Sequence, residues 1–200
     1  MALQTLVKVS NITNLSDARY CAGMGVELVG FVMDTFSDDY VPSEKMKEIK
    51  SWLAGVKIVG ETQSSDYNEI KSLVQSYEID ILQISDASLL PAITDLGKPI
   101  ILKVDADSAY LEDELERYSQ FVSYFLIEGE ELTEFLVYHL KEYAFNYPII
   151  LGFDITAEKL LSVMEEIPVK GIALKGSQEI RPGYKDYDEL SNILELLEID

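Results

Sequence analysis

Acidic, hydroxyl and amide side chains follow short apolar runs at many points along this sequence. They are Ser10, Asn11, Asp34, Glu61, Gln63, Ser85, Asp86, Asp105, Glu128 and Asp154, and Lys103 and residues 175–177 (Lys-Gly-Ser) lie in the same kind of position. Oxygens of this kind, gathered in one place, could hold a hard cation such as Mg²⁺ or Ca²⁺, or a polyol. The acids lie far apart in the chain, so no local spacing indicates a metal, and a chain with 36 acidic residues carries acids in its loops in any case. Their chemistry therefore depends on the elements that position them.

Those elements alternate along the chain. Short apolar, β-branched runs predict strands, and stretches with a period of 3.6 predict helices. The expected strands are 6–10, 28–33, 56–61, 79–85, 99–105, 122–128, 148–152 and 171–175. The expected helices are 16–24, 43–53, 66–77, 87–96, 108–118, 130–143, 157–167 and 187–197.

The expected strands are apolar on both faces, as in residues 149–151, Ile-Ile-Leu, which is typical of parallel strands covered on both sides. Eight strand–helix units without a linker or a break in composition predict an α/β fold, a single (βα)8 TIM barrel domain over residues 1–200. An open doubly wound sheet is the alternative, but no Gly-x-Gly-x-x-Gly follows the first strand. In a barrel the residues after the strands meet at one mouth, where a small-molecule ligand would bind.

The charge balance limits the classes of partner that the protein can bind. Lys and Arg number 16 and Asp and Glu 36, so the net charge is −20, which argues against nucleic acid and against anionic membranes. A single Cys excludes a disulfide framework, and neither a zinc spacing nor another metal or cofactor site is expected. With no basic leader and no long apolar run, we expect a cytoplasmic protein. Tyrosines at 138, 143 and 147 leave an oligomer surface open, although partial burial is the more ordinary explanation for them.

Several motifs then occur in order. Residues 8–14 are Lys-Val-Ser-Asn-Ile-Thr-Asn, residues 30–33 Gly-Phe-Val-Met, residues 80–84 Asp-Ile-Leu-Gln-Ile, and residues 182–186 Pro-Gly-Tyr-Lys-Asp. In these motifs the chain resembles the phosphoribosylanthranilate isomerase family of tryptophan biosynthesis, which opens with Lys-x-Cys-Gly-Ile-Thr-Asn and closes with Glu-x-x-Pro-Gly-x-Lys-Asp. The resemblance spans nearly the whole chain and implies the same barrel.

The resemblance also implies a reaction, the Amadori rearrangement of an aminoaldose phosphate to an aminoketose phosphate. A general acid opens the ribose ring, and a general base takes the proton from C2. The family's base is the Cys of the first motif, which corresponds to Ser10, and its acid is an Asp that corresponds to Glu128. A serine hydroxyl is a far weaker base than a thiolate, and it has no neighbouring His to activate it.

Positions that the resemblance assigns to the substrate's aromatic end have changed as well. The family's Arg, which meets the anthranilate carboxylate, corresponds to Asp39, and its His after the fourth strand corresponds to Ser85. Asn11, next to Ser10, belongs to the same set of candidate binding residues. An acid in place of an Arg reverses the charge that an anionic ligand would meet.

Positions that the resemblance assigns to the substrate's phosphate have changed too. The family's Gly-Gly pair corresponds to Phe153 and Asp154, and its Ser-Ser-Gly to Lys175, Gly176 and Ser177. An acid at 154 would repel a phosphate, whereas Lys175 would favour an anion.

Three hypotheses follow. The joint change of base, acid, carboxylate and phosphate positions favours a barrel that has diverged to another small-molecule role or to an interaction role without catalysis. The alternative is a functional phosphoribosylanthranilate isomerase that uses Ser10 and Glu128. Because a fold alone does not fix function, we treat the enzyme activity as open at this point.

Overall fold

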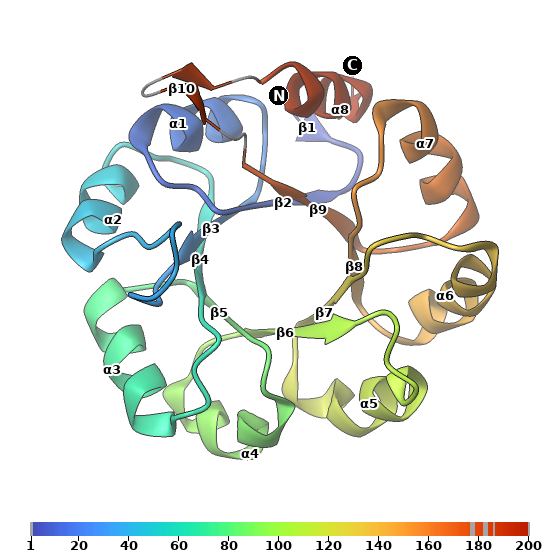
Figure 1. The fold of residues 1–200 in the computed structure, drawn as a ribbon, viewed down its shortest axis with the longest axis horizontal. Coiled ribbons are helices and arrows are strands. Elements are labelled where there is room, and N and C mark those ends of the chain that lie inside the picture. Colours follow the sequence, from blue (N-terminus) through green and yellow to red (C-terminus); the bar gives the residue numbers. More distant parts are fainter. Residues whose placement is uncertain (1, 177–178, 182–183, 186, 200) are drawn as a thin grey trace.

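The computed structural model describes residues 2–176, 179–181, 184–185 and 187–199, and its central feature is a closed parallel barrel (Figure 1). The barrel strands are β2 (Leu6–Ser10), β3 (Leu28–Val32), β4 (Lys57–Glu61), β5 (Ile81–Ile84), β6 (Ile100–Asp105), β7 (Tyr124–Glu128), β8 (Ile149–Gly152) and β9 (Gly171–Lys175). They follow one another around the ring in chain order, and the parallel pair of β2 with β9 closes it. The predicted (βα)8 barrel is confirmed.

Helices follow the strands and form the outer layer seen in Figure 1. They are α1 (Leu15–Gly23), α2 (Ser43–Lys50), α3 (Tyr67–Tyr77), α4 (Leu90–Ile93), α5 (Leu111–Tyr118), α6 (Glu134–Asn146), α7 (Ala157–Glu166) and α8 (Asp188–Leu196). Side-chain caps start several of them. Asn14 accepts a hydrogen bond from the Asp17 amide, and Asp66 accepts one from the Glu69 amide.

The fourth helix departs from its prediction. A continuous helix was expected over residues 87–96, but the chain forms a 3₁₀ turn (η1, Ala87–Leu89), the single α-turn of α4 and a second 3₁₀ turn (η2, Thr94–Leu96). Pro91 lies at the start of α4 and has no N–H. It therefore cannot donate the backbone hydrogen bond that a continuous helix would need at this position. A third 3₁₀ turn (η3, Ser119–Phe121) follows α5.

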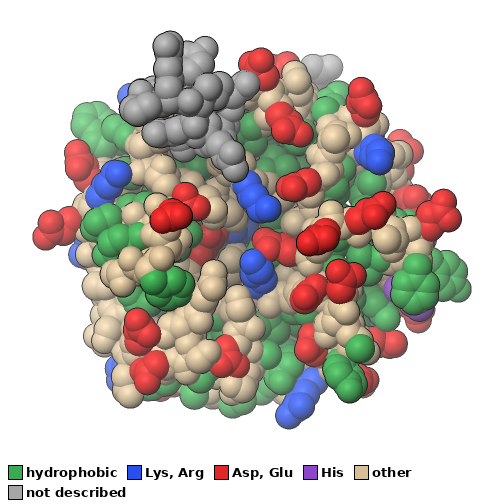
Figure 2. Space-filling model, viewed as in Figure 1, with side chains coloured by type: hydrophobic (Ala, Val, Ile, Leu, Met, Phe, Trp, Pro, Cys, Tyr) green, Lys and Arg blue, Asp and Glu red, His purple; other side chains and the backbone are tan. Residues whose placement is uncertain are grey.

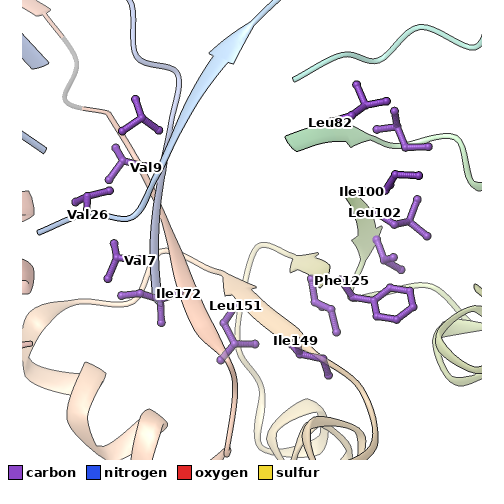
Figure 3. Close-up of a cluster of buried hydrophobic side chains, with 14 of the residues drawn as sticks. Val7, Val9, Val26, Leu82, Ile100, Leu102, Phe125, Ile149, Leu151 and Ile172 are labelled. Atoms are coloured by element: carbon purple, nitrogen blue, oxygen red, sulfur yellow. The ribbon is translucent and has the colours of Figure 1, made fainter. Parts of the chain in front are cut away.

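Both faces of the strands are buried, as predicted. Side chains that point outward, among them Val7, Leu102, Phe125 and Leu151, pack beneath the helices (Figure 3). A separate apolar cluster fills the inside of the barrel with Leu28, Val59, Ile81, Ile101, Leu126, Ile150 and Ala173. The barrel is therefore a packed core rather than a pore, and only its ends are open to a ligand.

Two small antiparallel sheets lie outside the ring. Ala2–Leu3 (β1) pairs with Glu198–Ile199 (β12), and Glu179–Arg181 (β10) pairs with Tyr184–Lys185 (β11). In the part of the chain that the structure describes, no helix is long and apolar enough to cross a membrane.

Candidate active site

Polar residues cap the apolar cluster inside the barrel. Side chains two residues apart on a strand share a face. Glu61 therefore follows Val59, Lys103 follows Ile101, and Glu128 follows Leu126, each on the inner face. Ser10 lies opposite Lys175 across the β2–β9 pair, and Glu61 lies opposite Gln83 across the β4–β5 pair. The C-terminal ends of the strands thus bring acids, amines and a hydroxyl to one mouth.

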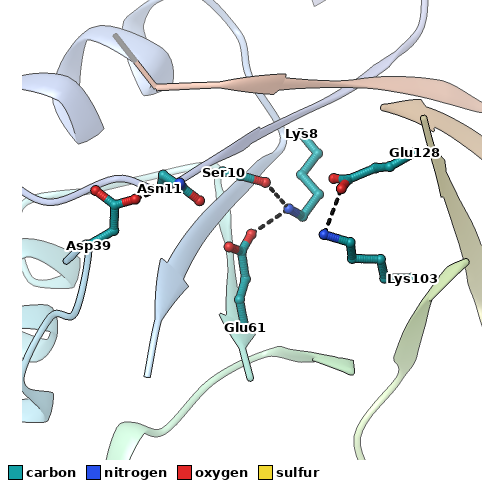
Figure 4. Close-up of polar contacts among 7 residues, drawn as sticks. All are labelled: Lys8, Ser10, Asn11, Asp39, Glu61, Lys103 and Glu128. Atoms are coloured by element: carbon teal, nitrogen blue, oxygen red, sulfur yellow. Dashed lines mark hydrogen bonds and ion pairs between the residues drawn. The ribbon is translucent and has the colours of Figure 1, made fainter. Parts of the chain in front are cut away.

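Lys8 joins two of these groups. Its ammonium donates hydrogen bonds to Ser10 Oγ and to Glu61 Oε1, the latter with Nζ and Oε1 2.5 Å apart (Figure 4). Lys8 is completely buried, and Glu61 is 7% exposed. Gly30 on the neighbouring strand makes room for this pair, because a Cβ at that position would overlap Glu61 Oε1. The three side chains form a buried network that ends on Ser10.

A second ion pair lies on the other side of the mouth. Lys103 Nζ lies 2.7 Å from Glu128 Oε2, and the Glu128 side chain is 26% exposed (Figure 4). Gly152, the register partner of Glu128 on β8, again leaves room: a Cβ there would lie 2.6 Å from Glu128 Cγ. Each glutamate therefore has a lysine as its ion partner and a glycine beside it.

A cavity of about 760 Å³ opens at this end of the barrel. Ser10 and Glu128 both line it, together with Asp154, Lys175 and Gly176 among others. This volume is in the range of small-molecule sites. Figure 2 shows basic side chains at the centre of this face, surrounded by acidic ones. Among the residues that line the cavity, Lys175 is basic, and Glu128, Asp154, Asp188 and Glu189 are acidic.

The candidate phosphate residues lie along this cavity. Lys175 Nζ and Asp154 Oδ1 are 3.9 Å apart, with both side chains largely exposed, so this is a loose surface pair. The Gly176 amide donates to the Ser10 carbonyl, which ties β9 to β2 at the mouth. Ser177 lies outside the described residues.

The candidate residues for the aromatic end take other positions. Asn11 adopts a left-handed conformation with φ 58° and donates from Nδ2 to Asp39 Oδ2 at 2.7 Å. Asp39 is therefore held beside the end of β2 by a neutral amide. Ser85 is exposed just beyond β5. Asn11, Asp39 and Ser85 are not among the residues that line the cavity described above.

The acids after the strands do not converge as a cation site would require. Asp34 is buried and accepts hydrogen bonds from the Thr62 hydroxyl and the Gln63 amide. Asp86 starts η1, and the Ser88 hydroxyl that donates to it holds the pKa of this carboxyl below its ordinary value. Asp105 accepts from the Asp107 amide in its own loop. Among the described residues no group of three or more His, Cys, Asp or Glu side chains could hold a metal ion.

Sequence reasoning missed the parts played by Lys8 and Gln83. Lys8 interrupts an apolar strand two residues before Ser10, and that spacing was the available signal that the two share a face. Gln83 is 8% exposed, and its buried Oε1 accepts no hydrogen bond within the described part of the chain. A buried acceptor without a partner is costly, but Gln83 is not among the residues that line the cavity.

The tyrosines near α6 divide between core and surface. Tyr143 is buried, whereas Tyr138 is 73% exposed. Phe135 and Phe145 on the same helix are exposed as well, and the rings of Phe135 and Tyr138 contact His139. This aromatic surface is compatible with an oligomer, which stays a prediction.

Comparisons with known proteins agree with the geometry. No protein-family model matches the chain. The N-(5'-phosphoribosyl)anthranilate isomerase of Petrotoga mobilis is 27% identical over 188 residues, covering 90% of each chain. The protein of the same name from Maridesulfovibrio salexigens is 23% identical over 201 residues, covering 94% of this chain and 96% of the relative.

Solved structures match over the same length. The dimeric phosphoribosylanthranilate isomerase of Thermotoga maritima, studied as engineered monomers, superimposes with a TM-score of 0.80 at 20% identity, covering 96% of this chain and 98% of the other. A phosphoribosylanthranilate isomerase in complex with reduced 1-(o-carboxyphenylamino)-1-deoxyribulose 5-phosphate superimposes with a TM-score of 0.79 at 21% identity and the same coverage. At these identities the superpositions support the shared fold.

Proposed function

Because the chain belongs to the phosphoribosylanthranilate isomerase family, we propose that it is itself an isomerase of this kind, which converts an aminoaldose phosphate to an aminoketose phosphate by an Amadori rearrangement. Both relatives described above bear this name, and each aligns with 90% or more of this chain. The comparisons favour this alternative over a barrel that has diverged to another small-molecule role or to an interaction role.

One observation carries the proposal. Ser10 and Glu128 come from strands on different sides of the barrel, yet both line the same cavity at its C-terminal end. The reaction needs one group that gives a proton and one that takes a proton, both within reach of a single substrate. The cavity is large enough for a sugar phosphate that carries an aromatic ring.

Other residues would bind the substrate. Lys175 is the cation on the side of the cavity where the family holds its phosphate, and it would compensate in part for Asp154. No step of the rearrangement requires an added cofactor, since the substrate and the product are isomers and no electrons are exchanged with another molecule.

The test is a turnover assay. Purified protein is mixed with freshly prepared phosphoribosylanthranilate, and loss of the substrate's fluorescence is followed beside a Glu128→Ala control. Turnover that disappears in the control supports the proposal. Turnover equal to the control, with a folded wild-type protein, contradicts it.

A second function is favoured by one specific observation. Asp39, at the position that corresponds to the family's Arg, is an acid whose Oδ2 accepts a hydrogen bond from the neutral amide of Asn11. That favours a ligand without an anionic aromatic end. If the assay fails, binding of aminosugar phosphates that lack an aromatic carboxylate is the next measurement, and the divergent barrel becomes the better hypothesis.

A further inference from the structure

The Ser10 hydroxyl has a defined direction. An ammonium group has three hydrogens to donate and no lone pair, so in the bond from Lys8 the Ser10 oxygen is the acceptor. The hydrogen of Ser10 must then point elsewhere. Since Ser10 lines the cavity, this hydrogen is available to an oxygen or nitrogen of a bound ligand. Ser10 is arranged as a hydrogen-bond donor.

Glu128 is arranged in the opposite sense. Lys103 Nζ, 2.7 Å away, makes its carboxylate one half of an ion pair. An ionised carboxylate only accepts hydrogen bonds and protons. The side chain is partly exposed and lines the same cavity, so one substrate can reach both groups.

The buried pair behind Ser10 needs a reason beyond stability. Lys8 and Glu61 lie next to an apolar cluster, and burying two charges costs desolvation that their attraction only partly offsets. Apolar side chains of similar size would hold the barrel as well or better. A buried ion pair is weak evidence for stability, and this one contacts a residue that lines the cavity. Here the pair keeps an ammonium against Ser10 Oγ.

We propose that the two proton-transfer groups act in the reverse order to that implied by the family's motif: Ser10 gives the proton that opens the ribose ring, and Glu128 takes the proton from C2. Lys8 and Glu61 are positioning residues that act through Ser10. This inference rests on the proposed isomerase function and adds the direction of each transfer.

The protons and electrons balance. Ser10 gives its hydroxyl proton to the ring oxygen while Lys8 passes a proton to Ser10 Oγ, the C1–O bond breaks, and the nitrogen lone pair forms a C=N bond. Glu128 takes the C2 proton, the electrons of the C2–H bond form C1=C2, and the C=N electrons return to nitrogen. Glu128 then returns its proton to C1, the proton on the C2 oxygen passes through Ser10 to Lys8, and C2 becomes a carbonyl. Both groups end as they began.

The tests use substrate labelled with deuterium at C2. Ser10→Ala slows ring opening, so we expect turnover to fall about 100-fold and the deuterium isotope effect on kcat to shrink toward unity. Glu128→Asp slows removal of the C2 proton, so its isotope effect should rise above that of the wild type. If Ser10 is the base, the isotope effect rises in Ser10→Ala and falls in Glu128→Asp, and the inference is overturned.

Ser10→Cys gives an independent answer because it restores the family's residue. A thiol is a weak donor, and beside the Lys8 ammonium it favours the thiolate, which has no hydrogen to give. We expect Ser10→Cys to turn over no faster than Ser10→Ala. Faster turnover than the wild type would make residue 10 the base and overturn the inference.

The positioning residues are tested by Glu61→Gln, which keeps the size of the side chain and removes its charge. We expect kcat to fall more than KM rises, with an isotope effect that moves in the same direction as in Ser10→Ala. A purely structural part for Glu61 would leave the isotope effect unchanged. A wild-type protein without turnover contradicts the proposed function itself, whereas an active wild type with unchanged isotope effects contradicts only this inference.

Discussion

Replacing Lys8 alone should destabilise the fold far more than replacing Lys8 and Glu61 together. Lys8 is fully buried, and the Glu61 side chain is 9% exposed, so neither charge can turn to water when its partner is removed. Breaking a buried pair costs about 3–5 kcal/mol, whereas exchanging both partners for apolar residues is about neutral.

The two single variants should differ in a definite order. In Lys8→Met the Glu61 carboxylate loses Lys8 as its ion partner. We therefore expect the free energy of unfolding to fall by about 5 kcal/mol, the upper end of the range for a broken buried pair. In Glu61→Leu the Lys8 ammonium keeps Ser10 as an acceptor, so we expect a loss nearer about 3 kcal/mol. The double variant should lie within about 1 kcal/mol of the wild type.

Urea unfolding of the four proteins at neutral pH measures these free energies and the coupling between the two sites. Intact near-native circular dichroism in the double variant is the control for folding. Losses that simply add in the double variant would mean that the two side chains do not interact. Single variants that lose less than about 1 kcal/mol would refute the reasoning that this pair is desolvated.

Further predictions concern the mouth and the packing around it. Gly152→Ala should lower turnover about tenfold or more by displacing Glu128, while thermal unfolding changes little. Lys175→Ala should raise KM about tenfold for a phosphorylated substrate and leave kcat nearly unchanged, as steady-state kinetics would report. Burial raises the pKa of Tyr77 above its ordinary 10.0, so folding stability should fall as pH rises beyond that value, and Tyr77→Phe should flatten this slope in urea titrations. The buried Cys21 should react with a thiol reagent only when the protein unfolds, at the rate of unfolding.

The barrel was predictable because each strand is apolar on both faces, a pattern that few other architectures need. The meeting of Ser10 and Glu128 followed from the same topology, since parallel strands bring their C-terminal ends to one mouth. The broken fourth helix could have been predicted in part, because Pro91 lies within the run assigned to it. The apolar periodicity of residues 87–96 nevertheless predicted a continuous helix.

The pairing of Lys8 with Glu61 could not be predicted from the sequence. A period of two shows that Lys8 and Ser10 share a face, but which residue of another strand lies opposite depends on the stagger of the closed barrel. The acids after the strands misled for a related reason. Asp34, Asp86 and Asp105 bond to hydroxyls and amides of nearby loops, and such contacts depend on loop conformation rather than on residue type.

The two interior glycines limit how this mouth can be altered. A side chain at position 30 would overlap Glu61, and one at position 152 would crowd Glu128. A change at either glycine therefore forces the glutamate beside it to move, so a new residue at 30 or 152 requires a new residue or a new side-chain conformation at 61 or 128. The places of the two carboxylates are thus set by the side chains that their neighbouring strands lack as well as by the lysines that pair with them.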